Sequence, residues 1–207
     1  MTTGYASSAS MTGEPPPVVL DATAFVLLNA VHLKKLASTE QLASLLALAP
    51  TRLQAQLEWA AASGLLLSMP GGHMLLPEGS AAVQRHYRES YAALRSDTTV
   101  TQWYTRFEAL NTRFIARLSA WQQTGGDEGA LYKALEVIDQ LAAALVVLLP
   151  LIPRYADYQR RFVAALDQIE AGDSDMLCNP RRDSAHNIWF EFHEDILSVL
   201  GRPRDTT

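Results

Sequence analysis

Residues 38–79 carry the sequence STEQLASLLALAPTRLQAQLEWAAASGLLLSMPGGHMLLPEG. Thr39 can cap a short apolar helix, which Ala49-Pro50 ends because proline disrupts a helix interior. Thr51 can cap a further helix, and Gly64 is the kind of residue that commonly follows a helix end. The first part of this stretch therefore predicts two short helices joined by a tight turn.

Two further signals complete the N-terminal region. Apolar residues flank Pro70-Gly71-Gly72 on both sides, a pattern typical of a small hairpin. Upstream, Asp21 can cap a helix that runs to Leu36. The resulting order of helix, helix, turn, helix and hairpin predicts a winged helix-turn-helix domain over residues 18–79.

Residues 25–79 resemble the winged helix of MarR-like bacterial regulators. The resemblance lies in the capped short helix, the Leu-rich third helix, the glycine that follows it (Gly64) and the hairpin. The same segment is similar to the N-terminal dimerisation domain of small-molecule O-methyltransferases, a winged helix that binds no DNA. PadR and GntR regulators, which place a helical domain after a winged helix, match the domain order better. The resemblance implies a fold and not a single function. After residue 79, no Gly-rich loop follows a strand, which argues against an enzyme of the methyltransferase class.

The remainder of the chain predicts helices only. We expect them near residues 80–96, 98–123, 128–149, 154–171 and 183–200. Apolar residues recur at three- and four-residue steps from Val100 to Trp121 and from Ala185 to Leu200, as in helices with one buried face. These stripes predict an all-α bundle over residues 80–200, with a ligand pocket between the aromatic side chains as an additional possibility. The expected fold class is mostly α, a winged helix followed by a helical bundle.

The terminal segments and the composition indicate the cellular location that we expect for the protein. Residues 1–17 are rich in Ser, Thr, Gly and Pro and lack the features of a secretory signal, so we expect a disordered arm. Residues 201–207 are expected to form a short tail. The longest apolar run, 141–152, contains a proline and is too short for a bilayer, which takes about 20 residues, so no membrane partner is expected. A single cysteine, Cys178, excludes an intramolecular disulfide and fits a cytoplasmic location.

The charge balance argues against general nucleic-acid binding. The chain has 17 Lys and Arg against 22 Asp and Glu, a net charge of −5. Residues 1–79 contain three basic residues, Lys34, Lys35 and Arg52, against five acidic ones. Because phosphate contacts from Lys and Arg supply much of the affinity for DNA, this is a small number of cations for a DNA-binding domain.

A regulator would nevertheless place the third helix in the major groove, where Arg, Gln and Thr side chains can contact bases and phosphates. The candidate DNA-contacting residues are Lys34, Lys35, Thr51, Arg52, Gln54 and His73. We expect a homodimeric transcriptional regulator of double-stranded DNA, with a small-molecule or protein effector acting on the helical domain at residues not assigned. The alternative is an adaptor that binds no DNA and uses both domains for contacts with another protein.

The last predicted helix contains several ionisable residues. His186 and His193 lie seven residues apart, about two turns, so they are too far apart to share a metal unaided, and no metal or other cofactor is expected. Asp183 is the expected N-cap of this helix. Three acidic residues are expected to form a solvated face, namely Glu191, Glu194 and Asp195.

The basic residues of the helical region lie mostly near acidic residues or predicted helix ends, for example Arg154, Arg161 and Arg181. We expect them on solvated surfaces, where such charges contribute little. The alternative is an anion pocket for an acidic metabolite, because the arginine side chain suits carboxylates and phosphates. No nucleophile is paired with a base, so the sequence predicts no catalytic site.

Overall fold

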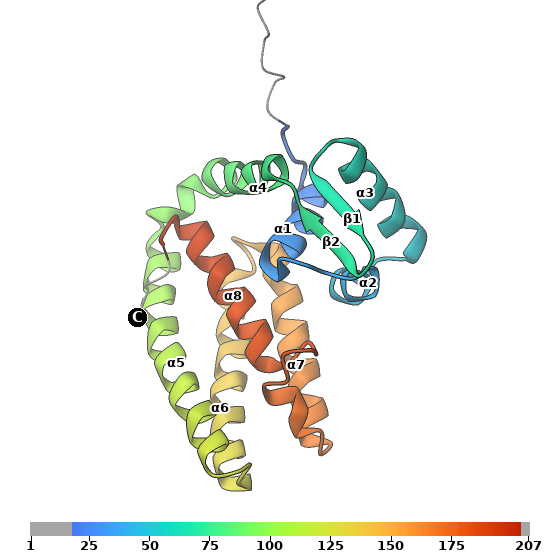
Figure 1. Ribbon diagram of the computed structural model, residues 1–207. Helices are drawn as coiled ribbons and strands as arrows, with labels where there is room; N and C mark the ends of the chain where they lie inside the picture. The colour runs from blue at the N-terminus through green and yellow to red at the C-terminus, as the bar shows by residue number, and fades with distance from the viewer. Residues whose placement is uncertain (1–17, 204–207) are drawn as a thin grey trace, which may run out of the picture.

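A computed structural model describes residues 18–203 and shows a mostly α-helical chain with one small hairpin (Figure 1). The α-helices are α1 (Ala22–Lys34), α2 (Thr39–Leu46), α3 (Pro50–Ala62), α4 (Pro77–Ser90), α5 (Thr98–Gln123), α6 (Glu128–Ala144), α7 (Ala156–Glu170) and α8 (Ala185–Leu200). The strands are β1 (Leu66–Met69) and β2 (Gly72–Leu75), and the short 3-10 helices are η1 (Ala92–Arg95), η2 (Leu145–Leu148), η3 (Pro153–Tyr155) and η4 (Ser174–Leu177). The expected fold class is confirmed. The expected arm over residues 1–17 and the end of the expected tail lie outside the residues that the structure describes.

The first two helices are capped by side chains. Asp21 caps α1 as predicted, its carboxylate accepting a hydrogen bond from the backbone of the first turn. The N-cap of α2 is Ser38 and not Thr39, so that prediction is wrong by one residue. Ser38 Oγ accepts from the backbone N–H of Gln41, and the Gln41 side chain accepts from the backbone N–H of Ser38. This reciprocal pair satisfies two N–H groups that a helix start leaves unpaired.

The third helix begins at Pro50, one residue before the predicted cap Thr51. Proline suits a first helical position because its missing N–H would have no partner there. Gly64 follows the helix as predicted, and its φ of +70° is the left-handed conformation common at that position. The apolar side of α3 faces the core through Leu53, Leu57 and Ala60.

The hairpin is antiparallel, with Leu66 opposite Leu75 and Ser68 opposite His73. The chain between α1 and α2 joins its outer edge, because the backbone groups of Ala37 and His73 exchange two hydrogen bonds of 3.1 and 2.8 Å. Gly72 has a φ of +146°, and a Cβ at this position would lie 2.6 Å from the carbonyl oxygen of Ala37. A glycine is therefore needed where the two segments meet.

The long helices α5, α6, α7 and α8 form the bundle (Figure 1). The two predicted apolar stripes are its core: the α5 positions are buried except for Trp121, which is half-buried, and every α8 position of the stripe is buried. Two helices predicted after residue 79 are shorter than expected, since α6 gives way to η2 and α4 gives way to η1, and α1 ends at Lys34, two residues before the predicted Leu36. In the described part of the chain, no helix combines the length and the apolar character needed to cross a membrane.

The winged-helix part and the bundle share one continuous core. Helix α1 packs against both α4 and α8, and the ring of Phe25 on α1 meets the ring of Tyr87 on α4 edge to face at 5.1 Å. The boundary expected between residues 79 and 80 falls inside α4. Helix α1 therefore belongs to both parts, so a shift of the bundle against α1 would be transmitted to the winged helix.

Candidate functional site

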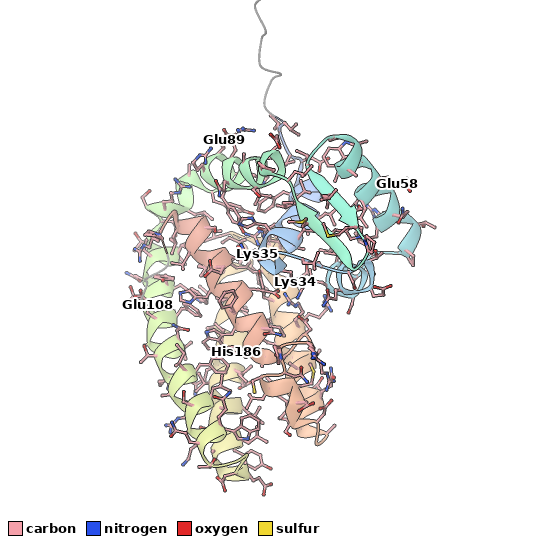
Figure 2. All side chains as sticks on the ribbon, in the orientation of Figure 1. Lys34, Lys35, Glu58, Glu89, Glu108 and His186 are labelled. Carbon is pink, nitrogen blue, oxygen red and sulfur yellow. The ribbon has the colours of Figure 1, made fainter. Side chains whose placement is uncertain are left out.

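Helix α3 presents to solvent a side that combines polar residues with the large apolar side chain of Trp59. Thr51, Arg52 and Gln54 are all exposed in its first turns, and Arg52 is the one basic residue of the helix. Gln54 Nε2 donates a 2.8 Å hydrogen bond to Glu58 Oε1 one turn further on. Figure 2 shows Glu58 on the outer side of α3, away from the bundle. These three candidate residues thus lie on the exposed half of α3, with Arg52 and Gln54 on its two flanks, and this half carries little positive charge.

The exposed side of the hairpin is apolar. Side chains alternate between the two faces of a strand, so residues two apart share a face, and Leu67 lies directly opposite Met74. The large exposed side chains of the hairpin are Leu67, Met69 and Met74. The hairpin of β1 and β2 corresponds to the wing of a winged helix. A wing that reaches a DNA backbone would use cations, and this exposed face offers none among its described side chains.

The candidate residue His73 points to the inner side of the hairpin. Its Nδ1 and Nε2 lie 2.9 Å from Ser68 Oγ and Thr39 Oγ1, respectively, and the residue is buried. Burial lowers the pKa of His73, which keeps the ring neutral near pH 7. His73 therefore ties the wing to the start of α2, and in this arrangement it is not positioned to contact a phosphate.

Lys34 is the second candidate that lies away from α3. Its Nζ is 2.7 Å from Glu191 Oε1 and 3.7 Å from Asp183 Oδ1, and its side chain is only 14% exposed. Lys35 is exposed beside it. Figure 2 shows both lysines at the junction of α1 with the bundle, well apart from Glu58 on α3. The structure thus brings together three of the six candidate residues on α3 and places the other three elsewhere.

The junction contains a buried ionic cluster that the sequence analysis missed. Asp195 on α8 is fully buried, and its two carboxylate oxygens are paired with the guanidinium of Arg154. Tyr155 OH, Tyr158 OH and Asn29 Nδ2 each donate to the same carboxylate over 3.1 Å. Burial is the main cause that raises the pKa of both tyrosines well above its ordinary value, so they remain protonated donors. Since Asn29 belongs to α1, this cluster fastens α1 to α7 and α8.

A second ionic group lies next to it. Arg161 is buried and donates to Asp183 Oδ2 over 2.8 Å and to Glu191 Oε2 over 2.7 Å. Lys34 binds the other oxygen of Glu191, so the group runs from α1 through α8 to α7. Burial by itself would raise the pKa of Asp183, but Arg161 and Lys34 together outweigh it and lower that pKa.

These two groups correct several predictions. Glu191 and Asp195 are buried and ion-paired, so they do not form a solvated acidic face, and Glu194 between them is half-buried. Asp183 pairs with Arg161, and the N-cap of α8 is Ser184. The expectation of solvated arginines is likewise wrong for Arg154 and Arg161. One signal was present in the sequence: Glu191 and Asp195 are four residues apart and directly adjoin the apolar stripe of α8.

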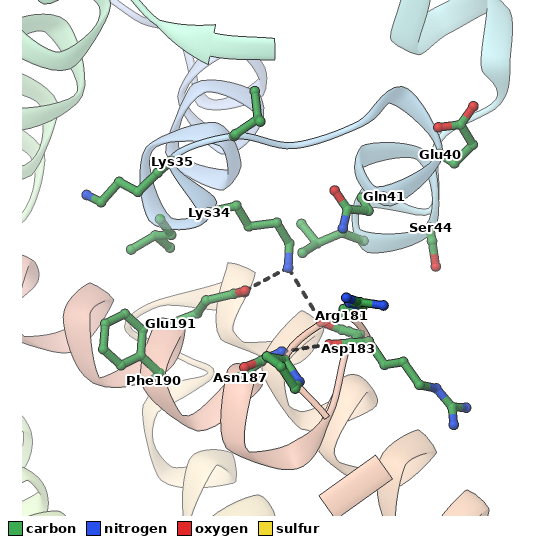
Figure 3. A pocket seen from close by; sticks show the side chains of 15 residues that line it. Lys34, Lys35, Glu40, Gln41, Ser44, Arg181, Asp183, Asn187, Phe190 and Glu191 are labelled. Atoms are coloured by element: carbon green, nitrogen blue, oxygen red, sulfur yellow. Dashed lines mark hydrogen bonds and ion pairs between the residues drawn. The ribbon is translucent and has the colours of Figure 1, made fainter. Parts of the chain in front are cut away.

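A cavity of about 630 Å³ opens beside the second ionic group (Figure 3). One wall comes from the end of α1 and from α2, and the opposite wall comes from residues 180–183 and the first turns of α8. Its volume is in the range of small-molecule sites. The cavity therefore lies where the winged-helix part meets the bundle, and Lys34 and Glu191 line its interior.

The two histidines of α8 pack against aromatic rings of α5. The ring of His193 meets Phe107 edge to face at 5.0 Å, and that of His186 lies 6.4 Å from Phe114. Burial lowers the pKa of His186. Over residues 18–203, no three His, Cys, Asp or Glu side chains gather closely enough to hold a metal ion.

Comparison with models of protein families, with curated proteins and with solved structures finds no match for this chain. Its function is therefore inferred from the fold and from the chemistry of its surfaces.

Proposed function

We propose that this protein is a transcriptional regulator that binds double-stranded DNA as a homodimer through α3. The observation that carries the proposal is the exposed side of α3, on which Thr51, Arg52 and Gln54 reach solvent near the start of the helix. Recognition helices of helix-turn-helix proteins contact base edges with their N-terminal residues. Arginine, glutamine and threonine are side chains that hydrogen-bond to base edges in the major groove.

The charge of the surface sets the kind of binding that we expect. Arg52 is the one cation of α3, and the wing adds none on its exposed face. Each protomer can therefore neutralise few phosphates, so affinity for non-specific DNA is expected to be weak. A dimer doubles the contacts and presents two copies of α3 to a two-fold symmetric site.

The junction provides a route from the bundle to α3. Lys34 and Asn29 hold α1 against Glu191 and Asp195 of α8, and α1 also contacts α2 and α3. An effector that shifts α8 against α1 would change the orientation of α3 in each protomer. The spacing between the two copies of α3, and with it the affinity for DNA, would then depend on the effector.

The test is selection of DNA sites from a random double-stranded library at low salt, followed by affinity measurements on any enriched sequence. The protein is expected to enrich a two-fold symmetric sequence, and Arg52→Ala is expected to lower affinity roughly tenfold, as for loss of one good base contact. Arg117→Ala is the matched control, because Arg117 is exposed on α5, far along the bundle. Failure to enrich any sequence, or equal binding by Arg52→Ala, would reject the proposal.

A second candidate function is supported by the apolar wing. Exposed Leu67, Met69 and Met74 lie beside a third helix with a single cation, which suits contact with another protein better than contact with phosphate. The variant Met69→Lys separates the two functions. If the wing lies against DNA, the added cation strengthens DNA binding; if the protein is an adaptor, DNA binding is absent in both forms.

A further inference from the structure

The cavity between α2 and α8 carries an excess of positive charge. Four basic side chains line it, Lys34, Lys35, Arg181 and Arg182, against three acidic ones, Glu40, Asp183 and Glu191. The excess of one positive charge matches a ligand with one negative charge. The exposed rim of the cavity is where such a ligand would exchange with solvent.

Several of these groups are already paired, which identifies the cations left for a ligand. Arg182 binds Asp173 over 2.7 Å, while Arg181 forms no side-chain ion pair with any residue between 18 and 203. Lys34 makes one short contact, to Glu191, and a longer one of 3.7 Å to Asp183. An ammonium group has three N–H donors, so at least one donor of Lys34 remains for a ligand. Lys34 and Arg181 both line the cavity, and Figure 3 shows them coming from opposite walls, Lys34 from the end of α1 and Arg181 from the segment before α8.

The same cavity has an apolar side. Phe190 and Leu36 both line it, and about half of the surface of each residue is exposed to solvent (43% and 50%). Large apolar side chains exposed inside a concave surface are typical of small-molecule sites, where a few polar groups fix the orientation of the ligand. In Figure 3, Phe190 lies on the side of Lys34 opposite Arg181. The cavity thus places an apolar surface and a cationic end within one site.

The backbone at the rim is in a rare conformation. Lys35 has a φ of +65° and a ψ of −48°, and the N–H of Leu36 donates to the carbonyl of Lys34 over 2.8 Å. This is a γ-turn with positive φ, which is strained for a residue with a side chain. Strained residues of this kind gather at ligand-binding and switch segments, and Lys35 forms the connection from α1 to α2.

We propose that this cavity is the effector site of the regulator and that it binds a small organic monocarboxylate. The carboxylate is held between Arg181 and Lys34, and the apolar part of the ligand lies against Phe190 and Leu36. The role of this site as an effector site rests on the proposed function. Binding of the carboxylate needs no DNA, so the ligand site and the DNA-binding function can fail separately. Because the ligand touches α1, the connection from α1 to α2, and α8 together, its binding holds the winged helix in one position on the bundle.

The test uses the full chain in the absence of DNA, and phenylacetate is the probe. Its binding is followed by calorimetry and by backbone NMR. We expect phenylacetate to bind at concentrations up to about 10 mM and to shift the signals of Lys35, Gln41 and Asn187 around the cavity. The neutral isostere phenylacetamide should bind at least roughly tenfold more weakly, because it cannot form charge-assisted hydrogen bonds. Inorganic phosphate is the second probe and reports an anion site without an apolar part.

Two variants and a control locate the site. Arg181→Ala should weaken phenylacetate binding at least roughly tenfold, and Ser44→Glu, which adds a negative charge at an exposed lining position, should abolish it. Arg117→Ala should bind like the unaltered protein. The proposal is overturned if phenylacetate fails to bind, if Arg181→Ala binds it equally well, or if phosphate binds and phenylacetate does not. If the protein binds phenylacetate but selects no DNA site, the proposed regulatory function is rejected and the proposed carboxylate-binding site stands.

Discussion

Lys34 and Glu191 join the first helix of the described chain to the last, with Lys34 Nζ 2.7 Å from Glu191 Oε1. Both side chains are largely buried, and the second oxygen of Glu191 is held by Arg161 on α7. Residues 157 positions apart in the sequence thereby share one ionic group. The group fixes α1, and with it the winged helix, on the bundle.

The first prediction concerns this contact directly. Lys34→Met and Glu191→Gln are each expected to destabilise the protein, and the double variant should be less destabilised than the sum of the two. The coupling energy expected for two contacting residues in one ionic network is about 0.5–3 kcal/mol. Urea denaturation of the four proteins measures it. Additive effects would show that the two side chains do not interact in solution.

Asp195 should matter more than any exposed acid. Asp195→Asn removes the charge that Arg154 faces in the core and leaves a buried guanidinium without its partner, which costs about 3–5 kcal/mol. Asp139→Asn, at an exposed position of α6, is the matched control and should change the free energy of unfolding by less than about 0.5 kcal/mol. Thermal and urea denaturation provide both values. Equal stability of the two variants would contradict the structure of the cluster.

The lowered pKa of the Asp183 carboxyl group predicts how the stability of the fold depends on pH. Its pKa is lower in the folded protein than in the unfolded chain, because Arg161 and Lys34 outweigh the effect of burial. The ionised carboxylate therefore stabilises the fold at pH values above its unfolded pKa, and this stabilisation is lost as the pH falls below about 4 through the folded pKa. Asp183→Asn should be less stable than the unaltered protein at pH 7, and the difference should shrink at pH 3. Asp139→Asn should show no such pH-dependent difference.

Gly72 tests the attachment of the wing. An alanine there would have both an unfavourable φ and a Cβ 2.6 Å from the carbonyl oxygen of Ala37. At Gly71 the φ is also positive, but the site has open space around a Cβ. Gly72→Ala should therefore be less stable than Gly71→Ala by at least about 1 kcal/mol, the usual lower cost of overpacking. Thermal denaturation compares the two variants, and equal melting temperatures would show that the hairpin does not pack closely on residue 37.

The sequence was sufficient where local chemistry decides. Asp21 at a helix start, Gly64 after a helix, and Pro70-Gly71-Gly72 between two apolar stretches each act within a few residues, so their roles were predictable. The stripe of α5 was predictable for a similar reason, because an amphipathic helix has a fixed periodicity. The exact N-cap residue of a helix was harder to predict, because Ser38 and Thr39 are chemically alike and are neighbours in the sequence.

The candidate site was only partly predictable. Thr51, Arg52 and Gln54 are exposed because helical periodicity turns them away from the buried side formed by Leu53, Leu57 and Ala60. For Lys34 and His73 the side-chain types could be chosen from the sequence, but their partners come from distant segments. The apolar character of the wing could be counted in the sequence, whereas the side of the hairpin that reaches solvent could not.

By itself, then, the sequence determined the helices, the hairpin, the core stripes and the small number of cations in the winged helix, because these depend on composition and on short-range periodicity. Tertiary structure alone decided that Glu191 and Asp195 are buried. A charged side chain can be buried only if partners such as Lys34, Arg154 and Arg161 meet it. Those partners come from α1, η3 and α7, and no local pattern on α8 shows which helices will pack against it.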